Sequence, residues 1–124
     1  MILDADLLFS NKQAVTATAE STNTLDLGVA GDAIGQELTI HVVVDTAFAT
    51  LTSLTVSLET SADNSDWTTV LSGPAIARAS LTKGASIFCV RVPQGLSRYV
   101  RLKYTVGGSN ATAGKVTAFA SKDL

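Results

Sequence analysis

Hydrophobic and polar residues alternate with a period of two in three stretches of this 124-residue chain. The clearest stretch is residues 98–106, where Val100, Leu102, Tyr104 and Val106 alternate with Tyr99, Arg101, Lys103 and Thr105. Residues 38–45 and 54–59 repeat the pattern. Because successive side chains of a strand point to opposite faces, each stretch predicts a β-strand with one buried and one solvated face.

Six weaker segments complete the predicted strands: 14–18, 23–27, 67–71, 76–81, 87–92 and 116–120. The residues between them are rich in Gly, Pro, Asn and Asp, which are typical of turns. No segment has the spacing of an amphipathic helix. Many short strands separated by turns predict an all-β, two-sheet antiparallel sandwich of about eight strands, with a jelly roll as the expected layout.

The first dozen residues precede the periodic strands and contain an apolar triplet, Leu7, Leu8 and Phe9. We therefore expect residues 1–12 to form an extended N-terminal arm and residues 13–124 to form a single β-sandwich domain. An exposed apolar triplet is unfavourable on a monomer, so the arm is expected to dock on another surface.

Charge is distributed unevenly along the chain. Residues 1–66 carry ten acids and one base, whereas residues 67–124 carry eight bases and one acid, so charges of −9 and +7 sum to the net −2. Such asymmetry is compatible with nucleic-acid binding, or with acidic and basic strands that pair within the fold or across subunits. The bases are spaced along strands, which favours protein contacts over nucleic acid.

The single cysteine, Cys89, lies in an apolar run and is expected to be a buried small hydrophobe without a disulfide partner. The chain starts without a basic segment before an apolar stretch, and no window approaches the roughly 18 apolar residues of a membrane span. These observations predict a soluble protein made inside the cell.

Candidate chemistry is sparse. His41 is the only histidine, which excludes a site with several histidines, and its position on one face of a predicted strand indicates a surface histidine. A nucleophile elbow and a glycine-rich phosphate loop are both absent. We therefore expect no enzyme activity and no metal or other cofactor.

The segment Asp63–Asp66 and the adjacent Trp67 each have two interpretations. The acidic segment could supply oxygen ligands to calcium, but Asp and Asn also cap turns, which is the favoured interpretation. Trp67 could stack against a sugar, or it could be a core aromatic that anchors a sheet edge, which we favour.

Both ends of the chain resemble a known family. The blocks that carry the resemblance are Met1-Ile2-Leu3-Asp4, Leu8-Phe9-Ser10, Gln13-Ala14-Val15-Thr16-Ala17-Thr18-Ala19, Asp26-Leu27-Gly28, Arg98-Tyr99-Val100-Arg101-Leu102 and Ala113-Gly114-Lys115-Val116-Thr117-Ala118. With these blocks, the sequence resembles the small cement (decoration) proteins of tailed bacteriophages, of the Bordetella-phage type.

The resemblance implies a jelly-roll virion protein on the capsid exterior, made in the bacterial host cytoplasm. Such a protein bridges subunits of the major capsid protein as a homodimer, without a substrate, a cofactor, or direct contact with nucleic acid or membrane. The family offers no catalytic residues to transfer. From the residues themselves, the expected protein contacts are Arg98, Tyr99 and Arg101 on a solvated strand face, together with Leu7, Leu8 and Phe9 of the arm. The alternatives are a carbohydrate-binding or host-adhesion module, or a neck or tail component.

Overall fold

The computed structural model describes residues 8–26, 38–91 and 97–122, and these residues are almost entirely β-strand. The one helical element among them is a single 3-10 turn, Arg78–Ser80. The strands are β1 (Leu8–Ala14), β2 (Ala19–Glu20), β3 (Leu25–Asp26), β4 (Leu38–Ala49), β5 (Ser53–Ser61), β6 (Thr68–Ser72), β7 (Ile76–Ala77), β8 (Ser86–Arg91), β9 (Tyr99–Gly107) and β10 (Ala113–Lys122).

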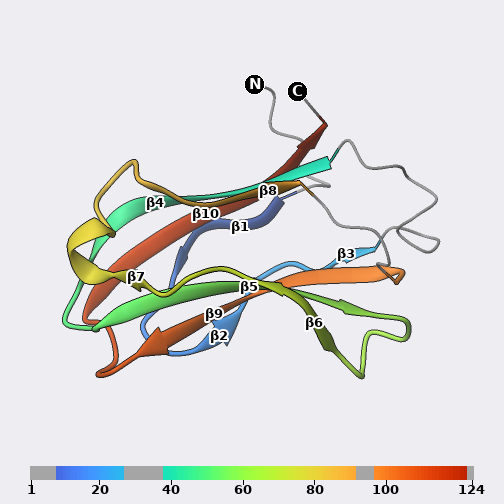
Figure 1. Cartoon of the computed structure of the whole chain (residues 1–124), viewed down its shortest axis with the longest axis horizontal. Coiled ribbons are helices and arrows are strands. Elements are labelled where there is room, and N and C mark those ends of the chain that lie inside the picture. Colours follow the sequence, from blue (N-terminus) through green and yellow to red (C-terminus); the bar gives the residue numbers. More distant parts are fainter. Residues whose placement is uncertain (1–7, 27–37, 92–96, 123–124) are drawn as a thin grey trace.

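The strands form two antiparallel sheets that pack face to face as a sandwich (Figure 1). One sheet has the order β1-β10-β4-β8, and we call it sheet A. The other, sheet B, has the order β2-β9-β5-β6, with β3 also paired to β9 and β7 also paired to β5. The short strands β2 and β3 pair with the same edge of β9, and β6 and β7 pair with the same edge of β5, so each sheet is four strands wide. The chain crosses between the two sheets as in a jelly roll. The predicted fold class is therefore confirmed.

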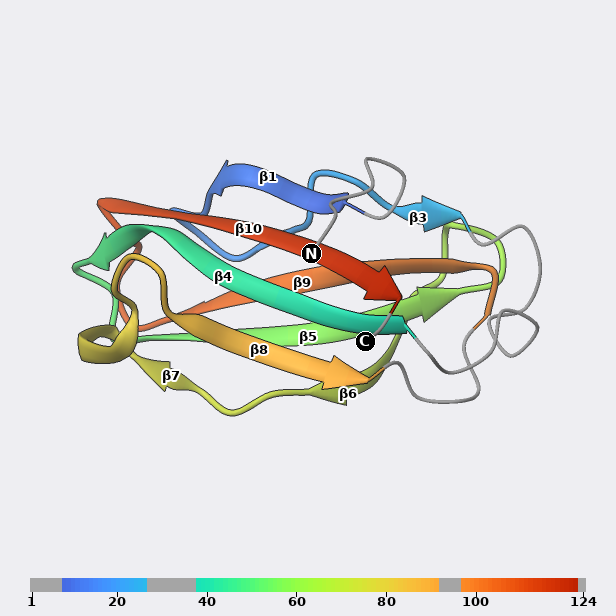
Figure 2. The ribbon, with the colours of Figure 1, turned by 90° about the horizontal axis from the view of Figure 1, so that it is seen from above.

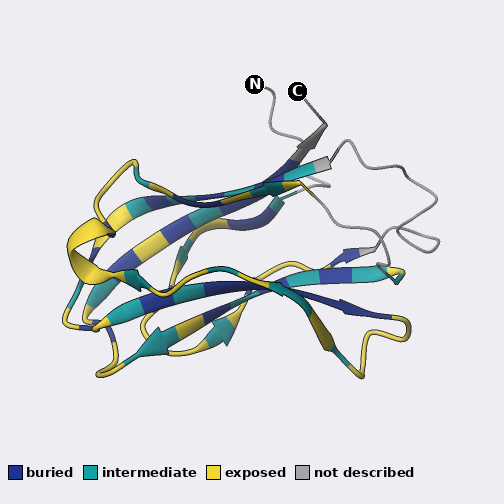
Figure 3. Cartoon of the chain, in the orientation of Figure 1, coloured by how far each residue is buried: buried dark blue, intermediate teal, exposed yellow. Residues whose placement is uncertain are grey.

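The core lies between the sheets and is formed by alternate residues of the long strands (Figure 3). In β9, Val100, Leu102 and Tyr104 are buried, as the period of two predicted. The same holds for Leu54, Val56 and Leu58 of β5, and for Ile40, Val42 and Val44 of β4. These three strands are paired or stacked in the centre of the sandwich, so their apolar faces have no route to solvent.

The first strand changes the predicted domain boundary. Residues 8–12, which the sequence assigned to an arm, lie in β1, which pairs with β10 at one edge of sheet A. Phe9 is 1% exposed and belongs to the core, so its apolar side chain docks within its own chain. The boundary at residue 12 is thus corrected to include β1 in the sandwich, whereas Leu7 and the rest of the arm lie outside the described residues.

A buried hydrogen-bond chain holds β1 against the opposite sheet. Ser10 is fully buried, and its Oγ lies 2.7 Å from the hydroxyl of Tyr104 on β9. Ser10 Oγ also donates to Gln13 Oε1 at 2.6 Å, so the Tyr104 hydroxyl is the donor to Ser10. Gln13 in turn accepts from the N–H of Thr22 and donates to the carbonyl of Glu20. Each buried polar group in this chain has a partner, as an interior site requires.

Burial between the sheets raises the pKa of Tyr104 well above the ordinary value of 10.0, and the bond to Ser10 opposes this rise only in part. The neutral phenol is therefore the form that the folded protein stabilises.

Truncation of Leu102 to Ala is expected to cost about 2–5 kcal/mol of unfolding free energy, because it opens a cavity in the centre of the core. Lys103→Ala, one position along on the opposite face, is the control and is expected to change stability by less than about 0.5 kcal/mol. Urea titration of both variants checks the register of β9. Equal losses would contradict it.

Tyr104→Phe tests the hydrogen bond between the sheets. Below pH 10, the variant is expected to be less stable by about 0.5–1.5 kcal/mol, because Ser10 loses its donor. Above pH 10, the unfolded chain ionises Tyr104 while the folded chain does not, so the wild type loses stability as pH rises and the gap between the two proteins narrows. Denaturant melts between pH 8 and 11 measure both effects, and a gap that stays constant with pH would contradict the buried phenol.

Candidate interaction surface

Three of the predicted contact residues lie together at one end of β9 on the outer face of sheet B. Tyr99 and Arg101 alternate with the buried Val100 and Leu102, so their side chains point away from the core. Arg98 comes directly before the strand and is exposed, and its guanidinium carbon lies 5.1 Å from the centroid of the Tyr99 ring. This cation–π contact presents an aromatic ring and a positive charge side by side.

Arg101 is held in place by two neighbours. Its Nε lies 2.8 Å from Oε1 of Glu59, its cross-strand partner in β5, and its guanidinium stacks on Trp67 at 4.1 Å from the ring centroid. Glu59 is 7% exposed although it is charged, and its ion pair with Arg101 compensates for this burial. The alternation in β5 predicts that Glu59 lies on the outer face. The sequence pattern does not predict its pairing with Arg101, because that pairing depends on which strands are neighbours.

The position of Trp67 corrects an expectation. The residue is half-buried on the outside of sheet B and is not part of the core cluster, so the core-anchor interpretation is wrong. The guanidinium of Arg101 stacks on the Trp67 ring, so the ring has a favourable contact outside the core. Arg101 therefore covers part of one face of the ring, and a sugar stacked on that face would need the same space.

The acidic segment before Trp67 is a capped turn. Oδ1 of Asp63 accepts hydrogen bonds from the backbone N–H groups of Ser65 and Asp66 and from the Ser61 hydroxyl. Asn64 adopts a left-handed conformation with φ of 62°, which Asn tolerates better than most residues. The turn interpretation is thus confirmed. These bonds, with that from Asp66 the largest, hold the pKa of Asp63 below its ordinary value of 3.8.

Two of the other predicted contact residues, Leu8 and Phe9, lie on the opposite sheet. Leu8 is half-buried and Phe9 is buried, both in β1. The structure therefore does not bring them together with Arg98, Tyr99 and Arg101.

The outer face of sheet A carries a small aromatic and sulfur cluster. His41 of β4 stacks on Phe119 of β10, with ring centroids 5.2 Å apart, and its Nδ1 lies 3.4 Å from Sγ of Cys89 on β8. His41 is a half-buried, outward-facing residue, in agreement with the surface interpretation. Cys89 is exposed, so the prediction of a buried thiol is wrong. The reason is a register shift in β8: Ile87 and Phe88 are both buried, which reverses the alternation after them.

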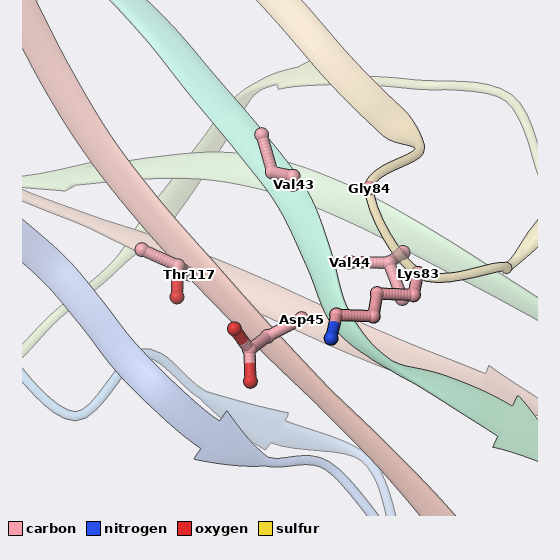
Figure 4. Close-up of a pocket in the computed structure, with 6 residues that line it drawn as sticks. All are labelled: Val43, Val44, Asp45, Lys83, Gly84 and Thr117. Carbon is pink, nitrogen blue, oxygen red and sulfur yellow. The ribbon is translucent and has the colours of Figure 1, made fainter.

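A shallow hollow of about 180 Å³ lies beside this cluster, between β4, β10 and the turn before β8 (Figure 4). Its only charged side chains are Asp45 and Lys83. Within the described residues, no group of three or more His, Cys, Asp and Glu residues is placed to hold a metal ion. No helix of the described chain is long and apolar enough to cross a membrane.

Comparison with known proteins places the chain in a family. The family model described as Bbp16 matches residues 9–120, which includes every strand from β1 to β10 in whole or in large part. No curated protein matches the chain.

Asp63→Asn is expected to lower the melting temperature at pH 7, because the variant keeps an acceptor oxygen but loses the charge that the turn stabilises. Since the pKa of Asp63 is lowered in the folded state, its charge stabilises the fold at pH values above the pKa of the unfolded chain. This stabilisation is lost as the pH falls through the pKa of the folded chain. The difference from the wild type should therefore shrink as the pH is lowered below 3.8.

Asp66→Asn is the matched control, because the Asp66 carboxylate accepts none of the three turn bonds.

Addition of calcium should leave the melting temperature unchanged. A large increase with calcium would restore the ion-binding interpretation of the turn.

Proposed function

The chain belongs to the Bbp16 family, which bears the name of a Bordetella phage protein, and on that premise we propose that it is a structural virion protein that binds the outside of a phage capsid. In this role it is a cement or decoration protein that stabilises the shell by bridging subunits of the major capsid protein. The β-sandwich fold of the chain is compatible with such a role.

The observation that carries the proposal is the outward-facing Arg and Tyr surface at the start of β9, where Arg98 is exposed and Tyr99 and Arg101 are half-buried. Arg and Tyr are enriched at the centres of protein interfaces, because they combine a large contact area with hydrogen-bonding groups. Arg98 and Tyr99 already contact each other, and Arg101 is already held by Glu59 and Trp67. Side chains that are ordered before binding lose less conformational entropy when a partner docks.

On a capsid, each individual contact can be weak. The same contact is repeated on every equivalent site of the shell, and a protein that holds two subunits at once gains from the high effective concentration of the second. A modest surface such as this one is therefore sufficient for cement, without a deep pocket.

The proposed partners are the major capsid protein and a second copy of this chain. We propose no enzymatic step, no cofactor, and no direct contact with nucleic acid or membrane. Because Phe9 belongs to the core and Leu8 is half-buried in β1, the capsid contact is assigned to the β9 surface in place of these two residues. Leu7 remains a predicted contact outside the described residues.

The proposal is tested by adding purified protein to capsids from which cement has been stripped. Arg98→Ala combined with Tyr99→Ala is expected to weaken occupancy about tenfold or more, because two interface anchors are lost. The heat resistance that the protein confers on the shell should fall in parallel. Higher salt should slow docking more than it loosens the bound state, since exposed charges act mainly on the association rate.

Lys115→Ala is the control, because Lys115 is exposed on β10 in the opposite sheet. Circular dichroism melts of all variants separate a lost contact from a lost fold. Unchanged occupancy of the Arg98 and Tyr99 double variant would contradict the β9 surface, and an absence of saturable binding by the wild type would contradict the cement function itself.

A further inference from the structure

The two long sides of the sandwich differ in how they are closed. On one side, β1 of sheet A is joined to the segment that carries β2 and β3 of sheet B (Figure 2). The backbone N–H of Asn23 donates to the carbonyl of Phe9 at 2.9 Å, and Asn23 Nδ2 donates to the carbonyl of Leu8 at 3.0 Å. The outer edge of β1 is therefore already bonded within the chain.

On the other side, β8 is the edge strand of sheet A and lies above β6 and β7 of sheet B (Figure 2), with Gly73 close to the Phe88 ring. In the described part of the chain, no strand pairs with the outer edge of β8. Apolar residues here pack against the core but stay partly exposed: Leu71 and Ile76 from sheet B and Val90 from sheet A. An open edge above a partly exposed apolar seam is a site where another strand can add.

The direction of the free backbone groups follows from the ladder. Val44 of β4 accepts from Gly84 N–H and donates to the Ala85 carbonyl, so its backbone groups point toward β8. Because these directions alternate along a strand, the backbone N–H and C=O groups of Val42 and Ile40 also point toward β8. Their register partners there are Phe88 and Val90. The N–H and C=O of Cys89, between those two residues, therefore face the open edge.

The side chains of β8 define what an added strand would meet. Phe88 is buried and Val90 half-buried on the inner face, whereas Cys89 and Arg91 are exposed on the outer face. A strand placed beside β8 would extend both faces, with its inward side chains over the apolar seam and its outward side chains beside Arg91. An alternation of apolar and polar residues in the partner matches this geometry.

Charge selects the polar residues of that partner. Lys83 and Arg91 flank β8, and neither forms an ion pair with another described residue. The sequence from residue 67 to residue 122 contains no Asp or Glu. Two β8 edges from different copies would bring like charges together, whereas carboxylates would be attracted to this edge.

We propose that the outer edge of β8 is a docking site for an extended acidic segment of a partner protein, which adds to sheet A as a fifth strand. The segment alternates apolar residues, which cover the seam at Leu71, Ile76 and Val90, with Asp or Glu beside Arg91. Only its source, a subunit of the capsid shell, rests on the proposed function.

The test uses a blocked seven-residue peptide of alternating Val and Glu, added to the isotopically labelled full chain at low ionic strength. Saturation with the peptide is expected to slow hydrogen exchange of the Cys89 amide about tenfold or more, because that N–H gains an acceptor. Chemical-shift changes should map to β8 and to Leu71 and Ile76. An alternating Val and Lys peptide, and a peptide with the Glu residues in one block, should produce neither effect.

Two variants separate the backbone bond from the charge. Cys89→Pro removes the outward N–H at an edge position that tolerates proline, and is expected to abolish binding, whereas Cys89→Ser keeps the N–H and should bind. Arg91→Glu should weaken binding about tenfold or more, while Lys115→Glu, the same reversal on β10, should not. If Cys89→Pro does not fold, the Arg91→Glu comparison and the exchange data decide the question.

Three outcomes would overturn the inference: an unchanged Cys89 amide, equal binding of the Glu and Lys peptides, or shift changes confined to the β9 surface. Because the assay contains no capsid, its failure leaves the cement function standing, and failure of capsid binding leaves the peptide result standing.

Discussion

The hydrogen bond between Tyr104 and Ser10 fixes how the first strand of this sandwich meets the opposite sheet. It joins β9 to β1 across the core, with β1 paired to β10 and Phe9 buried beside Ser10. A buried hydroxyl without a partner is unfavourable by about 1–3 kcal/mol, so both residues favour the closed arrangement. The bond adds to the pairing of β1 with β10 and to the Asn23 bonds that close this long side of the molecule.

The outer edge of β8 and the Arg and Tyr surface of β9 lie at two separate places on the molecule. The edge opposite β1 is β8, whose outer backbone groups pair with no described strand. The outer face of sheet B carries the Arg and Tyr surface of β9, where Glu59 and Trp67 hold Arg101. The first feature offers backbone hydrogen bonds and the second offers ordered side chains. A protein that bridges neighbours in a shell needs more than one such surface.

The charge asymmetry of the sequence is resolved partly within the fold. Glu59 from the acidic part pairs with Arg101 from the basic part, and Glu20 lies opposite Lys103 where β2 meets β9. Acidic and basic strands are thus neighbours in sheet B, one of the possibilities that the charge pattern left open. At β8, Arg91 lies opposite Thr39 of β4, so this base has no acidic residue as its cross-strand partner.

The sequence by itself determined the fold class, the central strands and their buried faces, because the period-two pattern is local: Val100, Leu102 and Tyr104 need only their own strand to be recognised as core. It also determined the capped turn at Asp63, whose bonds span two or three residues. Only the tertiary structure decided the positions of Phe9, Cys89, Trp67 and Glu59. Phe9 became core through pairing with β10, Cys89 turned outward through the register shift after Ile87, and Trp67 and Glu59 met Arg101 across strands. Strand pairing and bulges join residues that are far apart in the chain, and a local pattern of polarity carries no information about which strands become neighbours.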